Sequence, residues 1–341
     1  MSELRFAVLG TGYWSHLQIP AWFEVKGAKL VSLYNRTVSK AKKVAEKFDI
    51  EKVYGDAEEM LQKEKLDFID IITELPAHAR FVLLAAKYRV PVICQKPMAY
   101  DFKTCQKMVM ACKNAEIPFF IHENFRWQPR IRKVKEILDS GVIGKPFRAN
   151  IQLPNYASDN YGLEDQPFLK TYEHFALFDM GSHLFDLARF FFGEANSLYC
   201  QTYRTVDYIG GEDVVSSLIR MGDVMVHCEI CDKCNTIIFC EGKNGSLELD
   251  VSNELHIISE GKVTTIDCNV PPSKYPLISS KDEQLHGSNV IHSIIACNSH
   301  MLNSLKSGVP AETSGEDNLK TMSLVFSGII SANEDKVVKL N

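Results

Sequence analysis

Long hydrophobic runs are missing from this sequence. Its apolar stretches, such as Phe68–Leu75 and Phe190–Phe192, are far shorter than the ~20 residues that a membrane-spanning helix needs. The start, MSELRFAVLG, lacks the basic and apolar regions of a signal peptide. The ten cysteines are scattered through a chain of ordinary size, which is typical of reduced thiols. We therefore expect a cytoplasmic protein with no membrane contact.

An excess of basic residues is missing as well. The chain has 38 Lys and Arg against 43 Asp and Glu, a net charge of −5, whereas a general nucleic-acid binder is basic. There is no internal repeat and no low-complexity tract, and 45% hydrophobic residues exclude a disordered protein. A length of 341 residues is enough for two domains of ~150 residues each. We expect no nucleic-acid partner.

Short apolar runs alternate with helical patterns through the first 120 residues. Such alternation is typical of an α/β fold in which helices cover both faces of a parallel sheet. We predict a doubly wound Rossmann sheet over residues 1–122. The runs that read as strands are Arg5–Leu9, Lys29–Tyr34, Phe68–Ile72, Pro91–Ile93 and Pro118–Ile121, and those that read as helices are Val38–Phe48, Arg80–Lys87 and Phe102–Ala115.

The pattern changes after residue 122. A helix over Ile131–Ser140 is followed by several strand-like runs without helices between them, and Asn244-Gly245 is a strong hairpin signal. One helical region, Phe168–Phe192, interrupts these strands, and another, Asn289–Gly308, follows them. We predict that residues 123–341 form an α+β domain on a mostly antiparallel, open sheet.

A glycine turn lies between the first strand and the first helix. In Gly10-Thr11-Gly12-Tyr13-Trp14-Ser15, the glycines permit a tight turn and a close approach of the backbone to a pyrophosphate at the helix N-terminus. The third glycine of the usual fingerprint is missing, and Ser15 replaces it with another small residue. The place of the motif in a β-α-β start favours a dinucleotide site over a turn without function.

A carboxylate is missing after the second strand. NAD-specific folds usually present one there to the adenosine ribose, but this chain has Asn35 and Arg36. Arg36 can pair with the 2′-phosphate of NADP, or stack on adenine while Asn35 accepts the free ribose hydroxyls of NAD. A solvated arginine without function is the third reading. We expect both cofactors to bind.

Two further groups of residues, Lys96 and the pair Asp179 and His183, indicate a catalytic function. Lys96 follows a buried strand, at the sheet edge where ligands bind in an open α/β fold, although a lone lysine is more often solvated. Asp179 and His183 are four residues apart and would share one face of a helix. A carboxylate beside an imidazole suits acid–base catalysis. An equal alternative is that His183 is a core histidine whose hydrogen bonds are satisfied by Asp179 and that has no catalytic role.

The cysteines do not form a convincing metal site. Cys231 and Cys234 have zinc-like spacing, but a second pair with this spacing is missing. Residues at this spacing on a strand point to opposite faces. We expect reduced thiols and no metal.

Taken together, these motifs resemble the Gfo/Idh/MocA oxidoreductases over nearly the whole chain. The resemblance rests on the glycine turn, Lys96-Pro97, the Asp179/His183 pair and four further segments, and Tyr34–Thr37, Asn124–Pro129 and Phe185–Gly193 are closest to the D-apiose dehydrogenase-like branch. The further segments are Pro76–His78, His122–Arg126, Gly141–Pro146 and Thr313–Asp317. Gln95 departs from the family, which usually has a glutamate there.

The resemblance implies roles for the matching residues. Lys96 and His183 would flank the reacting hydroxyl carbon, with Asp179 completing the catalytic group, and the Lys96–Pro97 bond would be cis. Residues that would bind the cofactor are Gly10, Thr11, Gly12, Tyr13, Trp14, Asn35, Arg36, Thr73, Pro76, His78, Gln95 and Lys96. Residues expected to contact the substrate are Asn124, Arg126, Trp127, Asn155, Tyr156 and His183.

The sequence therefore predicts an NAD(P)-dependent dehydrogenase that oxidises a hydroxyl of a sugar or cyclic polyol. His183 would act as the base, and Lys96 would stabilise negative charge on the oxygen. The alternative is a catalytically silent, NAD(P)-binding sensor of the same fold. Because a sensor has no need of Lys96, Asp179 and His183 together, the enzyme is favoured. One face of an open sheet stays exposed unless another surface packs against it. We therefore expect a homodimer or homotetramer formed through this domain.

Overall fold

The computed structural model describes residues 3–155, 163–164, 166–231, 234–271, 277–278 and 287–340. It contains two compact units. The first holds residues 1–124 and 272–322, and the second holds residues 125–271 and 323–341.

The boundary expected at residue 122 assigns the helical region Asn289–Gly308 to the second domain, whereas the structure groups it with the first unit. Helix α10 (Ser288–Ser307) belongs to the first unit. Its apolar residues Ile291 and Ile294 pack against Leu17 and Ala21 of α1 (Ser15–Phe23). Burial of this apolar face joins segments some 270 residues apart in the chain, a pairing that no local sequence pattern carries.

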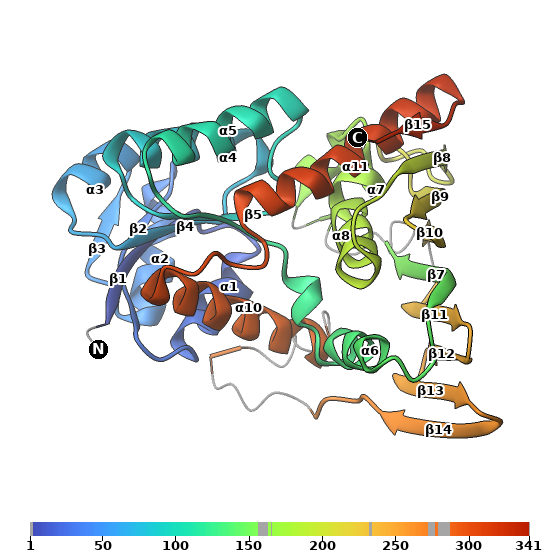
Figure 1. Cartoon of the computed structure of the whole chain (residues 1–341). Coiled ribbons are helices and arrows are strands. Elements are labelled where there is room, and N and C mark those ends of the chain that lie inside the picture. The colour runs from blue at the N-terminus through green and yellow to red at the C-terminus, as the bar shows by residue number, and fades with distance from the viewer. Residues whose placement is uncertain are drawn as a thin grey trace. The chain divides into compact units, whose positions relative to one another are not determined.

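The first unit is built on a six-stranded, all-parallel sheet in the order β3-β2-β1-β4-β5-β6 (Figure 1). The chain runs outward from β1 in one direction and then crosses to β4 on its other side. Ligands bind at such a switch point in open α/β sheets. The strands are β1 (Leu4–Leu9), β2 (Ala28–Tyr34), β3 (Lys52–Tyr54), β4 (Phe68–Ile71), β5 (Val92–Gln95) and β6 (Phe119–His122).

Helices cover both faces of this sheet, as expected (Figure 1). Helices α1, α2 and α10 lie on one face, and α3, α4 and α5 lie on the other. Asp56 and Asp101 cap α3 and α5 by accepting hydrogen bonds from the backbone N–H groups of Glu59 and Thr104, both at 2.8 Å. The bounds are α2 (Val38–Phe48), α3 (Ala57–Lys63), α4 (Leu75–Tyr88) and α5 (Phe102–Asn114).

The second unit is built on a nine-stranded sheet in the order β14-β13-β12-β11-β7-β10-β9-β8-β15. Only the β7–β10 pair is parallel, and the remaining pairs are antiparallel. The mostly antiparallel sheet of the second domain is therefore confirmed. The strands are β7 (Pro146–Pro154), β8 (Ser197–Tyr203), β9 (Val214–Met221), β10 (Val224–Cys231), β11 (Ile237–Gly242), β12 (Gly245–Leu249), β13 (Glu254–Ser259), β14 (Lys262–Asp267) and β15 (Val338–Lys339).

Helices of the second unit cover one face of this sheet, with α8 packed on β7 and β10. The helix expected over Phe168–Phe192 is divided into three, because residues 172–174 and Met180 leave the regular helix. Gly141, at φ = 72°, ends α6 as its sequence predicts. Among the described helices, none is long and apolar enough to cross a membrane. The helices are η1 (Asn124–Trp127), α6 (Pro129–Ser140), η3 (Pro167–Thr171), α7 (Phe175–Asp179), α8 (Gly181–Phe192) and α11 (Gly315–Glu334), which begins in the first unit.

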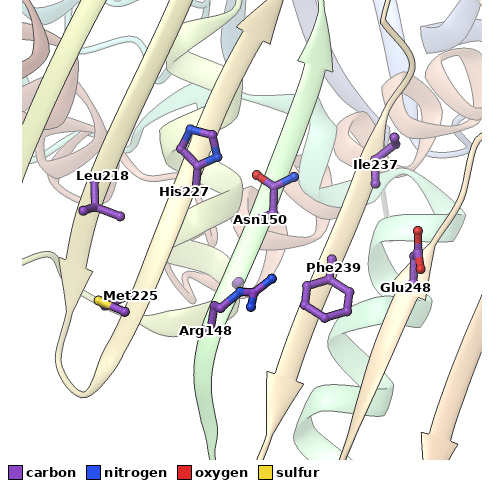
Figure 2. A pocket seen from close by; sticks show the side chains of 9 residues that line it. Arg148, Asn150, Leu218, Met225, His227, Ile237, Phe239 and Glu248 are labelled. Atoms are coloured by element: carbon purple, nitrogen blue, oxygen red, sulfur yellow. The ribbon is translucent and has the colours of Figure 1, made fainter.

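The other face of the nine-stranded sheet is open. Burial alternates along the strands, so that Val215 and Ile219 are fully buried while Leu218, between them, is 52% exposed. Figure 2 shows the side chains that line a hollow on this face, among them Met225 and Phe239. Within Val214–Ile219, only the residues that point to this face are therefore available to a partner.

Candidate active site

The turn after β1 has the geometry of a phosphate-binding loop. Gly10 has φ = 111°, and a Cβ at this position would lie 2.8 Å from the carbonyl oxygen of Ile72, so only glycine fits. Ser15 closes the turn by donating its hydroxyl to the carbonyl oxygen of Gly12 at 2.6 Å. At Gly12 a Cβ would have no heavy atom within 4 Å among the described residues. The backbone there borders open space.

Two buried hydroxyls lie at the switch point of the sheet. Thr11 follows β1 and Thr73 follows the neighbouring strand β4. Their Oγ1 atoms are shielded from solvent and have no hydrogen-bond partner within the part of the chain that the structure describes. Buried polar atoms normally find a partner. Together with the open space at Gly12, these hydroxyls fit the phosphates and the ribose of a dinucleotide.

The residues after β2 fit an adenosine ribose without a carboxylate. Asn35 is half-buried, and its Nδ2 donates to the carbonyl oxygen of Thr37 at 3.1 Å, which leaves Oδ1 as an acceptor. Arg36 is exposed, and within the described ranges it makes no ion pair. All three sequence readings of Arg36 therefore remain open.

His78 has different surroundings from those expected of a residue that lines the cofactor. Its side chain is buried, with Nε2 3.0 Å from the carbonyl oxygen of Thr73 and Nδ1 3.0 Å from that of Pro97. Burial lowers the pKa of His78. The ring therefore joins the loop after β4 to the segment after β5. Pro76, two residues earlier, is exposed at the start of α4.

Lys96 follows β5 and is half-buried. The Lys96–Pro97 bond is cis, as the sequence resemblance implies. The preceding Gln95 is buried, and its Nε2 lies 3.4 Å from Oε1 of Gln18, to which it donates. The side chain of Gln95 therefore points toward α1 and into the first unit.

A buried polar network beneath the turn was not predicted from the sequence. Asp70 of β4 accepts hydrogen bonds from Nε1 of Trp22 at 2.6 Å and Nε2 of Gln18 at 3.1 Å. Burial raises the pKa of Asp70 to about 6, while these two donors oppose the rise. Gln18 also donates to Asn298 of α10. The aspartate inside the apolar run FIDII was the signal in the sequence, because a polar residue in a buried strand needs partners.

Asp179 and His183 lie on consecutive helices and not on one. Asp179 is the last residue of α7 and is half-buried. His183 is in the first turn of α8 and is only 3% exposed. Met180 separates the two helices but keeps right-handed helical backbone angles, and its carbonyl oxygen still accepts from the N–H of Leu184 at 2.9 Å.

Two consecutive residues of η1 contact α8. The ring of Phe125 is stacked on the imidazole of His183, with centroids 3.7 Å apart and an angle of 7° between the planes. Arg126 forms two hydrogen bonds to Asp186, from Nε at 2.6 Å and from Nη2 at 2.7 Å. Both charged side chains are buried. Arg126 is therefore a structural partner of α8, and its expected contact with the substrate stays a prediction.

Two other expected substrate contacts also have partners within the protein. Asn124 is buried, and its Nδ2 donates to Oγ of Ser293 at 2.6 Å. Asn155 is buried and donates to the carbonyl oxygen of Asp213. These contacts orient the two amides toward the protein. Their expected contacts with the substrate stay predictions.

The remaining substrate candidates are Trp127 and Tyr156. Trp127 is buried beneath the guanidinium of Arg132, which lies 4.9 Å from its ring centroid. Tyr156 lies outside the described residues. Lys96 belongs to the first unit and His183 to the second, so their convergence on one substrate stays a prediction.

The two cysteines with zinc-like spacing do not share a strand. Cys231 ends β10, and Cys234 lies beyond it. The Cys234 thiol donates to the carbonyl oxygens of Cys231 at 3.2 Å and Leu153 at 3.4 Å. Both cysteines are free thiols.

Replacing Gly12 with alanine tests the phosphate cradle directly. We expect Gly12→Ala to leave the melting temperature unchanged, because its Cβ meets no described atom. Its methyl group would occupy space needed by the pyrophosphate, and NAD affinity is expected to fall by about tenfold or more, the loss of one good interaction. Titration calorimetry measures the dissociation constant.

Gly141→Ala is a control for the site of this glycine change. Its added methyl group also meets no described atom, but it lies at the end of α6, where φ = 72° strains any side chain, so it should lower the melting temperature and leave NAD affinity unchanged. An equal loss of NAD affinity in both variants, or none in Gly12→Ala, would contradict the cradle.

Comparison with known proteins finds two family models that match this chain. Residues 4–122 match the Gfo/Idh/MocA family described as "Oxidoreductase family, NAD-binding Rossmann fold". Residues 131–247 match the "GFO/IDH/MocA C-terminal domain".

Relatives match the chain over its full length. It is 34% identical over 349 aligned residues to the D-apiose dehydrogenase of Rhizobium rhizogenes, covering 100% of this chain and 98% of that protein. It is 24% identical to the myo-inositol 2-dehydrogenase of Thermotoga maritima, covering 99% of this chain and 98% of that one. An oxidoreductase from Agrobacterium radiobacter, solved with NAD+, L-tartaric acid and magnesium, has a TM-score of 0.92 at 33% identity, covering 99% of this chain and 98% of that one.

Proposed function

The chain belongs to the Gfo/Idh/MocA family of oxidoreductases, and from this premise we propose that it is an NAD-dependent dehydrogenase of a sugar or cyclic polyol. The observation that carries the proposal is the occurrence of a phosphate cradle at Gly10–Gly12 together with a buried histidine fixed by an aromatic stack. The relatives named for D-apiose and myo-inositol support a polyhydroxylated ring or chain as the substrate class.

In the proposed reaction, His183 removes the proton from the substrate hydroxyl, and Asp179 supports the resulting imidazolium. Lys96 donates a hydrogen bond to the same oxygen and stabilises its negative charge. The C–H bond breaks as the C=O bond forms. NAD, when bound, supplies the hydride acceptor.

The first unit provides the groups that would hold the cofactor. The turn Gly10–Gly12 would meet the pyrophosphate, and the hydroxyls of Thr11 and Thr73 would supply donors to it. Asn35 would face the adenosine ribose. His78 and Gln95 fix the adjoining loops through their buried hydrogen bonds. Tyr13, Trp14, Arg36, Pro76 and Lys96 complete the proposed cofactor set.

The experiment that tests this function is NAD reduction across a panel of D-apiose, other aldoses and inositols. Turnover on at least one of them is expected. Cofactor binding without turnover on any of them would favour a silent sensor instead.

Arg36 is the residue we propose for cofactor choice. With no carboxylate to repel a 2′-phosphate, the wild type is expected to bind both NAD and NADP. Arg36→Ala should weaken NADP binding more than NAD binding, because a guanidinium pairs with the phosphate through two charge-assisted hydrogen bonds. Dissociation constants for both cofactors measure the effect. An equal loss would show that Arg36 does not read the phosphate.

We also propose a homo-oligomer formed through the open face of the nine-stranded sheet. This face exposes Leu218 (52%) and Met225 (46%). It also carries charges of both signs, Arg148 and Glu248 (Figure 2), and a two-fold interface must be complementary to itself. Light scattering at micromolar concentration tests the assembly, and a monomeric mass would contradict it.

The cytoplasm is the compartment we propose. All ten cysteines are free thiols, and eight of them are buried. Free cysteines in this number are typical of proteins from compartments in which thiols are kept reduced.

A further inference from the structure

The ring of Phe125 covers one face of the imidazole of His183. The centroid distance of 3.7 Å and the interplanar angle of 7° describe a nearly face-to-face stack. His183 is buried, and Phe125 is half-buried. Rotation of the imidazole about its Cβ–Cγ bond would drive an edge of the ring into the phenyl ring. The stack therefore fixes the plane of the imidazole.

The stack is itself held in place by its neighbour in the chain. Arg126 makes two hydrogen bonds to Asp186, at 2.6 and 2.7 Å. Asp186 lies three residues after His183 on α8, so the two residues lie on neighbouring surface positions of one helix. The guanidinium of Arg126 also lies 5.5 Å from the ring centroid of Phe190 on the same helix. The segment that carries Phe125 is thereby fixed to the helix that carries His183.

We propose that Phe125 is a positioning residue for His183. This proposal rests on the proposed role of His183 as the base. Both ring nitrogens lie in the plane of the imidazole, so fixing that plane fixes the directions in which they accept and donate protons. A base works only when its lone pair points at the proton that it removes. Phe125 transfers no proton. It restricts His183 to the ring orientation needed for the reaction.

The matched pair of variants is Phe125→Leu and Phe125→Tyr. Leucine keeps an apolar side chain but loses the flat ring, whereas tyrosine keeps the ring. We expect Phe125→Leu to lower kcat on the order of tenfold, the scale of a mispositioned catalytic group, with KM for the sugar and Kd for NAD unchanged. Phe125→Tyr should retain most of the turnover. A rise in KM at unchanged kcat would overturn the proposal and make Phe125 a substrate contact.

A double-mutant cycle separates positioning from a general structural effect. If Phe125 acts through His183, Phe125→Leu should have no further effect on the residual kcat of His183→Ala, since the residue that it positions is gone. An additional tenfold loss in that background would overturn the proposal.

A readout that does not need turnover distinguishes this proposal from the proposed function. In the full-length protein with ¹³C-labelled histidine, the ring resonance of His183, assigned by its absence in His183→Ala, should be shifted upfield by the phenyl ring current. It should move downfield and broaden in Phe125→Leu but not in Phe125→Tyr. An unshifted His183 resonance in the wild type would contradict the stack. If the resonance behaves as expected but no sugar is oxidised, the function of the site is wrong and the positioning contact stands.

Discussion

His183→Ala is expected to lower kcat by ~10²–10⁴, the range for removing a general acid–base catalyst. Lys96→Met should also lower kcat severely, because the oxygen of the substrate then loses its charged hydrogen-bond donor. Neither residue belongs to the turn at Gly10–Gly12. The dissociation constant for NAD should therefore change little in His183→Ala, and should rise only modestly in Lys96→Met, which removes one member of the proposed cofactor set. Steady-state kinetics and calorimetry measure both quantities on the same preparations.

The chain offers a matched control for the histidine. His227 lies on the open face of the nine-stranded sheet and is paired with Ser216 at 2.9 Å (Figure 2). His227→Ala should leave kcat near the wild-type value. Near wild-type turnover in both His183→Ala and Lys96→Met would show that the catalytic assignment is wrong.

Arg126→Met is expected to reduce the free energy of unfolding by ~3–5 kcal/mol, the usual effect of leaving one buried partner of an ion pair uncompensated. The side chain of Asp186 is 0% exposed, and it would lose a guanidinium that makes two hydrogen bonds to it. Urea unfolding, followed by a probe in the second unit, measures the change.

Two further variants make this stability result interpretable. Arg148→Met removes an exposed pair with Glu241, whose charges are 3.7 Å apart, and it should cost less than ~1 kcal/mol. Arg126→Met combined with Asp186→Leu removes both buried charges and should recover much of the loss. An equally small loss in Arg126→Met and Arg148→Met would contradict a structural role for the buried pair.

Local patterns in the sequence were enough to predict the framework of both units. The apolar runs predicted the buried strands of the first sheet, and the Gly10–Gly12 turn was placed correctly between β1 and α1. Other strands had too short or too weak a hydrophobic pattern to be predicted from the sequence. β3 has only three residues, and β14 is exposed along most of its length, so no buried alternation marks it.

Contacts between distant residues decided what the sequence could not predict at the site. The pairing of Arg126 with Asp186, sixty residues later, is not marked by any local pattern. The contacts of the His78 ring with two backbone carbonyls are not marked by one either. In the same way, the stack of Phe125 on His183 depends on how η1 packs against α8.

The most direct test of the account is hydride transfer itself. The sugar or polyol turned over most rapidly in the panel would be deuterated at the carbon that bears the oxidised hydroxyl and incubated with wild-type protein and NAD. The account predicts that the deuterium appears at C4 of the reduced nicotinamide, and that His183→Ala greatly slows its appearance. Failure of every sugar to reduce NAD, or reduction with the deuterium released into water, would contradict it.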